Sequence, residues 1–113
     1  MTSLSLHLLI VEDDDALAAQ LAEQLHQSGH ETTLAQDGRR AIELVGQNRF
    51  DLIILDRILP KMDGIAVLKS LREHQILTPI IMMTALGQSR QKVEGLEGGA
   101  DDYVVKPVDP AEL

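Results

Sequence analysis

The sequence has no cysteine, only one Phe and one Tyr, and few basic residues, and each shortage excludes a class of function. Without cysteine there is no disulfide framework, no thiolate nucleophile and no cysteine-based zinc site. Phe50 and Tyr103 alone provide no stacking platform for single-stranded nucleic acid. Because 10 Lys and Arg face 18 Asp and Glu, the formal net charge of −8 argues against binding to phosphate backbones or anionic membranes.

A long apolar run is also missing. The apolar segment near the start, from Leu4 to Ile10, is interrupted by Ser5 and His7 and is followed by four acids. It is too short for a membrane span and lacks the basic flank and cleavage site of a signal peptide. A length of 113 residues suits one domain. We therefore expect a single cytoplasmic domain without a membrane segment.

Short apolar segments alternate with helical patterns along the chain, which is typical of βα units around a parallel sheet. Strands are expected over residues 6–11, 31–35, 52–55, 80–84 and 103–105. The second of these is the most polar, which places it at an edge of the sheet, whereas the continuous apolar sequences of the first, third and fourth suit strands covered on both faces.

Five helices are expected between and after these strands. Leucines at 17, 21 and 25 give the first an apolar stripe, and Gly29 ends it. Asp37 and Asp63 are expected to cap the second and third. The side chains of these two helices expected to face the core are Ala41, Ile42, Val45, Ile65, Leu68 and Leu71. A weaker fourth helix is expected over 88–98, and a fifth begins at Asp109, close to the end of the chain.

Acidic residues follow two of the predicted strands. Glu12, Asp13, Asp14 and Asp15 come after the first, and Asp56 closes the third. The carboxyl ends of parallel strands meet at one edge of a sheet, where two carboxylates about 4 Å apart repel by about 4 kcal/mol at an effective dielectric of about 20. A bound Mg²⁺ would offset this repulsion. The alternative is that an acid caps the first helix, which we accept for Asp15 and leave open for Asp14.

A hydroxyl and a lysine end two further strands at the same edge. Thr84 closes the fourth strand and Lys106 follows the fifth. Taken singly, Thr84 suits a helix cap and Lys106 a solvated loop charge. Together with the aspartates they form a set suited to Mg²⁺-assisted phosphoryl transfer to a carboxylate.

The motifs at these strand ends, taken together, resemble the receiver domain of bacterial two-component response regulators. The resemblance extends from about Leu6 to Leu113 and depends on VEDD (11–14), LD (55–56), LPKMDG (59–64), TA (84–85) and GADDYVVKP (99–107). It implies a flavodoxin-like, doubly wound (βα)5 fold with parallel sheet order 2-1-3-4-5, an order that is a property of the family. It further implies that residues 1–113 are a receiver with a truncated fifth helix, forming the N-terminal part of a longer regulator.

The same resemblance implies a role for each strand-end residue. Asp56 would accept a phosphoryl group from a sensor histidine kinase, and Thr84 and Lys106 would bind its oxygens. Thr84 and Tyr103 would form the switch. The Mg²⁺ ligands would be Asp13, Asp56, the backbone carbonyl of Ile58 and, through water, Glu12. The domain would be a phosphoacceptor that gains and loses its own phosphoryl group, not an enzyme that turns over other substrates.

A finer resemblance, to the subfamily with a winged-helix DNA-binding domain, implies a homodimer on activation and a transcriptional output. The matching charged positions on the dimer face are Lys92, Asp101, Asp102 and Glu112. DNA would be contacted only through a possible C-terminal effector. The alternatives are a receiver-like interaction module that signals without phosphorylation and a stand-alone receiver in a phosphorelay.

Other functions fit less well. A flavodoxin-like or dinucleotide-binding protein needs a first turn that accepts phosphate, which the acids after the first strand would repel. A phosphatase with a strand-end Asp nucleophile would need a second Asp where Ile58 stands. A metal site from His26 and His30 would need a helix that Gly29 breaks, so we interpret the histidines as incidental. Arg57, next to the phosphoacceptor, has no role that the sequence assigns.

Overall fold

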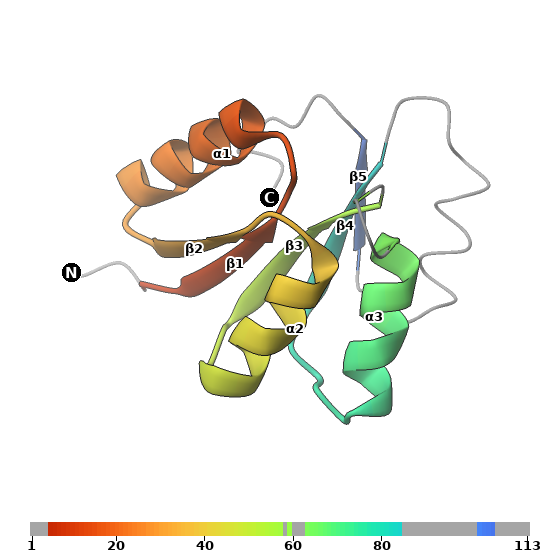
Figure 1. Ribbon diagram of the computed structural model, residues 1–113. Helices are drawn as coiled ribbons and strands as arrows, with labels where there is room; N and C mark the ends of the chain where they lie inside the picture. The colour runs from red at the N-terminus through yellow and green to blue at the C-terminus, as the bar shows by residue number, and fades with distance from the viewer. Residues whose placement is uncertain (1–4, 58, 60–62, 85–101, 106–113) are drawn as a thin grey trace.

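The computed structural model describes residues 5–57, 59, 63–84 and 102–105. Figure 1 shows their elements, which are β1 (His7–Val11), α1 (Asp15–Gln27), β2 (Glu31–Ala35), α2 (Gly38–Gln47), β3 (Leu52–Asp56), α3 (Gly64–Glu73), β4 (Ile80–Thr84) and β5 (Asp102–Val105). All the strand pairs are parallel, in the order β2-β1-β3-β4-β5. The α/β fold and the edge position of β2 are confirmed, while the predicted fourth and fifth helices lie outside the described residues.

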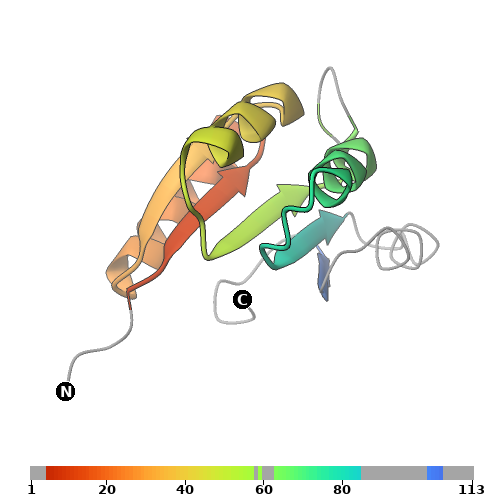
Figure 2. The same ribbon diagram turned by 90° about the horizontal axis from the view of Figure 1, so that it is seen from below.

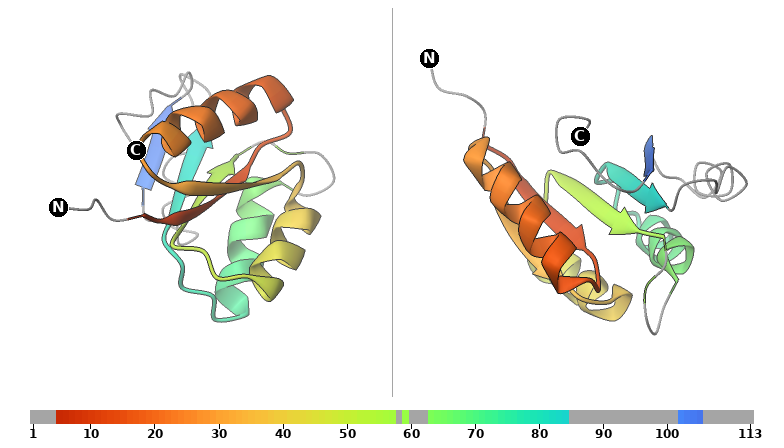
Figure 3. Two further views of the ribbon diagram at one scale, coloured as in Figure 1. Left: turned by 90° about the vertical axis from the view of Figure 1, so that its left-hand side faces the viewer. Right: turned by 90° about the horizontal axis from the view of Figure 1, so that it is seen from above.

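The three helices lie on opposite faces of the sheet. Helix α1 covers one face and α2 and α3 cover the other (Figures 2 and 3). Because strand side chains alternate between faces, each face has its own core. Leu8, Ile10 and Ile54 pack on the α1 side, and Leu9 and Leu55 on the other. Strands β1, β3 and β4 are therefore buried on both faces, which is why their sequences are apolar without interruption.

Strand β2 has the composition of an edge strand. Only Ala35 of its residues is buried, and Leu34 is 44% exposed. Its partner β1 lies on one side, in a register that pairs His7 with Glu31 and Val11 with Ala35. Within the part of the chain described here, no helix is long and apolar enough to cross a membrane.

The N-cap of helix α1 lies one residue earlier in the sequence than we expected. Asp14, not Asp15, is the N-cap, because its Oδ1 accepts hydrogen bonds from the amides of Ala16 and Leu17, both at 3.1 Å. Asp15 is the first helical residue, and its Oδ1 accepts a hydrogen bond from Gln36 Nε2 at 2.9 Å. The assignment of the cap to Asp15 was therefore wrong. Whether Asp14 or Asp15 is the cap depends on where the chain leaves its extended conformation. Four consecutive acids do not indicate that position.

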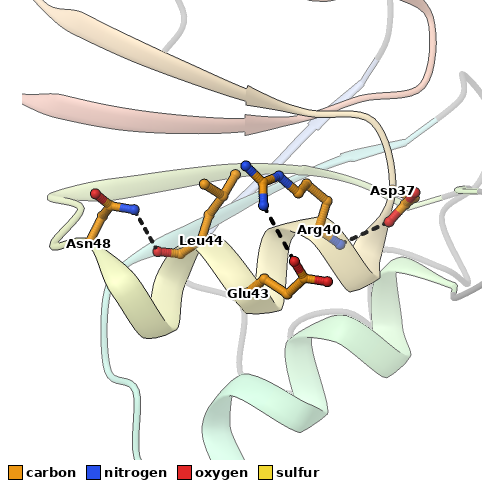
Figure 4. A network of polar contacts seen from close by, with 5 residues as sticks. All are labelled: Asp37, Arg40, Glu43, Leu44 and Asn48. Carbon is orange, nitrogen blue, oxygen red and sulfur yellow. Dashed lines mark hydrogen bonds and ion pairs between the residues drawn. The ribbon is translucent and has the colours of Figure 1, made fainter.

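Helix α2 is bounded by side chains that satisfy its backbone groups (Figure 4). Asp37 Oδ1 accepts from the amide of Arg40 at 2.9 Å, which confirms the predicted cap. At the other end Asn48 Nδ2 donates to the carbonyl of Leu44 at 3.1 Å. Arg40 and Glu43 form an exposed ion pair, which contributes about 0–1 kcal/mol. The caps, rather than this pair, define the helix.

The buried face of α2 differs slightly from the prediction. Ala41 is buried as expected, but the second buried apolar side chain is Leu44, while Ile42 and Val45 are only partly buried against the same core. The helix is rotated so that positions 41 and 44 face the sheet. In α3 the expected core residues Ile65, Leu68 and Leu71 are all buried, together with Val67, and Asp63 is the N-cap.

Two histidines that we interpreted as incidental have structural contacts at the amino ends of the strands. His7 Nε2 lies 2.8 Å from Thr33 Oγ1, and His7 Nδ1 lies 3.2 Å from the carbonyl of Arg49. Its ring also contacts Phe50, with centroids 4.6 Å apart. His30 Nδ1 accepts a hydrogen bond from the amide of Leu6, at 3.2 Å. These contacts join β1 to the segments on both sides of it.

The corrected cap predicts unequal effects of two substitutions at one position. Asp14→Ala should lower the free energy of unfolding by about 1 kcal/mol, because two amides lose their acceptor. Asp14→Asn removes the same charge but keeps a capping oxygen, so it should remain close to the parent. Urea unfolding of both variants measures the difference. Equal stabilities would show that Asp14 does not cap the helix.

Candidate functional site

The site begins where β1 and β3 end. The two strands are neighbours, and their ladder finishes with Val11 opposite Leu55. Glu12 and Asp13 follow β1, and Asp56 is the last residue of β3. Each of these three carboxylates offers one oxygen that lies within 4.8 Å of the other two. The predicted convergence of acids at this edge of the sheet is confirmed, and we name Glu12, Asp13 and Asp56 the acidic cluster.

Two members of the acidic cluster are buried. Glu12 is 1% exposed and Asp56 is 4% exposed, whereas Asp13 is exposed. The backbone of Glu12 is fixed by a hydrogen bond from its amide to the carbonyl of Ala35 at 3.0 Å. Carboxylates at this separation repel by about 3 kcal/mol at an effective dielectric of about 20. The sheet therefore holds like charges together, and the exposed Asp13 leaves the cluster open to solvent.

The composition of the acidic cluster fits a hard divalent cation. Its donors are all carboxylate oxygens, which Mg²⁺ prefers, and Mg²⁺ usually keeps several waters, for which a solvent-exposed member leaves room. Among the residues that the structure describes, this is the only group of acids and histidines close enough together to hold a metal. His26 and His30 are not part of such a group among the described residues.

The connection that follows Asp56 is held close to the start of α3. The amide of Arg57 donates to the carbonyl of Met83 at 2.8 Å, and the amide of Gly64 donates to the carbonyl of Arg57 at 3.0 Å. A Cβ on Gly64 would lie 2.9 Å from Arg57 Cα and closer still to the carbonyl oxygen of Asp56. Position 64 therefore needs glycine because of this close approach of backbone, which explains the Asp-Gly pair in the LPKMDG motif.

Arg57 has a partner that sequence reasoning missed. Its guanidinium Nη1 forms an ion pair with Asp63 Oδ1, the oxygen that also accepts a hydrogen bond from the amide of Ile65 at 3.0 Å. The side chain of Arg57 is 11% exposed and that of Asp63 is 55% exposed. A cation six residues before an acidic helix cap was the available signal, and it was too general to assign a role.

The remaining predicted site residues are described in part or not at all. Thr84 is the last residue of β4, opposite Val105, and Tyr103 pairs with Met82 in the backbone of β5. Ile58, Lys92, Asp101, Lys106 and Glu112 lie outside the described residues, and Asp102 is placed in β5 by its backbone alone. Their roles stay predictions.

Comparison with known proteins agrees with the strand-end chemistry. Residues 8–113 match the response regulator receiver domain family. The chain is a receiver domain of this family. Receivers are phosphoacceptors rather than turnover enzymes, and the acidic cluster is typical of their Mg²⁺ site.

Relatives of the receiver include whole regulators and single domains. It is 46% identical over 110 residues to the transcriptional regulatory protein SrrA of Staphylococcus aureus, covering 97% of this chain and 45% of that protein. The receiver of Francisella response regulator 1452 matches with a TM-score of 0.90 and 38% identity, over 95% of this chain and 88% of that one. The chemotaxis response regulator CheY4 of Vibrio cholerae matches with a TM-score of 0.89 and 33% identity, over 96% of this chain and 92% of that one. The chain spans about half the length of the curated relatives it matches.

Glycine at position 64 of the receiver can be tested against a second glycine. Gly64→Ala should lower the free energy of unfolding by about 1–3 kcal/mol, because the new methyl group would collide with backbone. Gly46→Ala, inside α2 with nothing within 4 Å of the added carbon, should raise it by about 0.5–1 kcal/mol. Thermal or urea unfolding checks both. A tolerated Gly64→Ala would contradict the close approach.

The receiver should also be more stable with Mg²⁺ than without it. Mg²⁺ at 100 times its dissociation constant would add about 2.7 kcal/mol to the free energy of unfolding if it binds the folded state alone. Asp56→Asn should reduce this gain and, in metal-free buffer, should stabilise the receiver by relieving the repulsion in the cluster. Asp15→Asn, which removes an acid outside the cluster, should keep the full gain. An equal gain in Asp56→Asn would place Mg²⁺ elsewhere.

Proposed function

We propose that this receiver is a phosphorylation-dependent signalling switch in which Asp56 accepts a phosphoryl group from a sensor histidine kinase. The observation that carries the proposal is the position of Asp56, which is buried at the end of β3 within 4.8 Å of two other carboxylates. Three carboxylates that repel one another do not stabilise a purely structural core. A site that binds a cation and a phosphoryl group, in contrast, needs such carboxylates as ligands and acceptor.

The transfer needs one carboxylate oxygen of Asp56 as nucleophile. It forms a bond to phosphorus as the bond to the phosphohistidine nitrogen breaks, and the product is an acyl phosphate with the electron pair left on the imidazole. Mg²⁺, held by Asp13, Asp56 and the backbone carbonyl of Ile58, and by Glu12 through water, would neutralise the developing negative charge. Glu12 and Asp13 would thus serve the reaction by holding the cation, and Asp56 by forming the covalent bond.

Thr84 and Lys106 are proposed to bind the phosphoryl oxygens. Their placement along the chain supports this role, because Asp56 lies opposite Met83 in the β3–β4 ladder and Thr84 follows directly. Thr84 in turn lies opposite Val105, the residue before Lys106. Thr84 therefore ends β4, and Lys106 comes directly after β5, at the same edge of the sheet as Asp56. Thr84 and Tyr103 would then transmit the effect of phosphorylation to the face that β5 forms with the predicted fourth helix.

The proposed output is control of transcription. SrrA, which this receiver matches over 45% of its length, is named a transcriptional regulatory protein. We infer a cytoplasmic regulator in which residues 1–113 are the N-terminal receiver with a (βα)5 fold, a C-terminal effector binds DNA, and phosphorylation favours a homodimer through Lys92, Asp101, Asp102 and Glu112. The second candidate is a stand-alone receiver in a phosphorelay, which the match over 92% of the CheY4 chain favours.

Phosphorylation can be measured directly. Incubation with acetyl phosphate and Mg²⁺ should add the mass of one phosphoryl group to the parent chain and none to Asp56→Asn, because the acceptor oxygen is lost. Asp15→Asn, a matched change at an exposed acid near the same edge, should still be modified. Intact-mass spectrometry after short incubations reads the result. No mass gain in the parent, or an equal gain in Asp56→Asn, would refute the assignment of Asp56.

A further inference from the structure

Among the described residues beside the acidic cluster, Arg57 is a charged residue that the proposed function leaves unused. It follows Asp56 directly and continues the alternation of β3, in which Ile53 and Leu55 face α2 and α3. That is the side on which Asp63 begins α3, and there the guanidinium forms its ion pair. The side chain of Arg57 is mostly buried although it carries a full charge. Burial of a charge in this way is costly unless it is paired.

Contacts of Arg57 help to hold the backbone next to Asp56. The ladder between β1 and β3 ends at Val11 and Leu55, one residue before Asp56. Beyond that point the chain is held by the pairing of Asp56 with Met83 and by the two backbone hydrogen bonds of Arg57, one to β4 and one from Gly64. The ion pair to Asp63 adds a side-chain contact to the same helix start. Arg57 therefore links the end of β3 to both β4 and α3.

We propose that Arg57 is a positioning residue for the acidic cluster, which through its ion pair with Asp63 fixes the backbone of Asp56 and so sets the affinity of the cluster for Mg²⁺. The inference rests on the proposed function, since it takes Mg²⁺ binding at the cluster as given. Arg57 itself acts through Asp63 and need not touch the metal. Asp63 then has two roles, as the N-cap of α3 and as the anchor for Arg57.

The two roles of Asp63 can be separated. Asp63→Asn keeps a capping oxygen for the amide of Ile65, but it removes the charge that holds Arg57. Arg57→Met keeps a long side chain and removes the guanidinium, while Arg57→Lys keeps the charge without the planar fork. A fourth variant combines Arg57→Met with Asp63→Asn. Urea unfolding of each variant establishes that it is folded before metal binding is compared.

The measurement is the Mg²⁺ dissociation constant, from amide chemical shifts of ¹⁵N-labelled protein titrated with MgCl₂. We expect Arg57→Met and Asp63→Asn each to weaken binding about tenfold, the lower end of the effect of residues that orient metal ligands. The double variant should be no weaker than the worse single variant, because both remove one interaction. Arg57→Lys should bind more tightly than Arg57→Met.

Each alternative gives a different result. If Arg57 acted only through its positive charge, Arg57→Met would bind Mg²⁺ more tightly than the parent, which would overturn the inference. Unchanged affinity in both single variants, or losses that add in the double variant, would overturn it too. A parent that binds no Mg²⁺, or an Asp56→Asn variant that binds it equally well, would refute the proposed function as well. Normal binding by the parent with unaffected Arg57 variants would refute this inference alone.

Discussion

The close approach of like charges at the ends of two buried strands is the constraint on which the rest of the structure depends. Glu12 follows β1 and Asp56 ends β3. The side chains of these neighbouring strands fill both cores, so the two carboxylates cannot separate without disturbing the sheet. Their repulsion, about 3 kcal/mol at an effective dielectric of about 20, is a substantial fraction of the usual net stability of a domain, about 5–15 kcal/mol. The fold therefore keeps a site that a cation or a positive side chain stabilises.

The neighbouring acids have partners of their own outside the cluster. Asp14 turns to cap α1, and Asp15 accepts a hydrogen bond from Gln36 at the end of β2. Near a helix N-terminus both carboxylates also interact favourably with the helix dipole. Five consecutive or converging acids thus divide by function into three that form the cluster and two that begin the helix. This division depends on the backbone conformation of a single residue after the end of β1.

Composition and periodicity were sufficient to predict the strands and the edge position of β2, because these follow from patterns repeated over several residues. The caps Asp37 and Asp63 follow from the residue type at a helix start, and the meeting of the acids follows from the common edge at which parallel strands end. The errors concern single contacts. Whether Asp14 or Asp15 caps α1 depends on where the chain turns. Which residues of α2 face the sheet depends on a small rotation set by packing. The contacts of His7 and Arg57 join segments far apart in sequence or across a turn, and no local pattern encodes them.

The two ends of the sheet are stabilised by different kinds of interaction. At the amino ends of the strands, side chains bind backbone groups without any need for a ligand, as His7 does with the carbonyl of Arg49, and as Arg72 does with the carbonyls of Ile76 and Thr78 at 2.8 and 2.9 Å. At the carboxyl ends, buried carboxylates face one another. Glu12 is hydrogen-bonded there too, because its Oε1 accepts from the amide of Asp14 at 3.1 Å. The carboxyl ends thus combine hydrogen-bonded groups with a cluster of like charges. A cation bound at this end would offset the mutual repulsion of the carboxylates, while the contacts at the amino ends keep the sheet fixed.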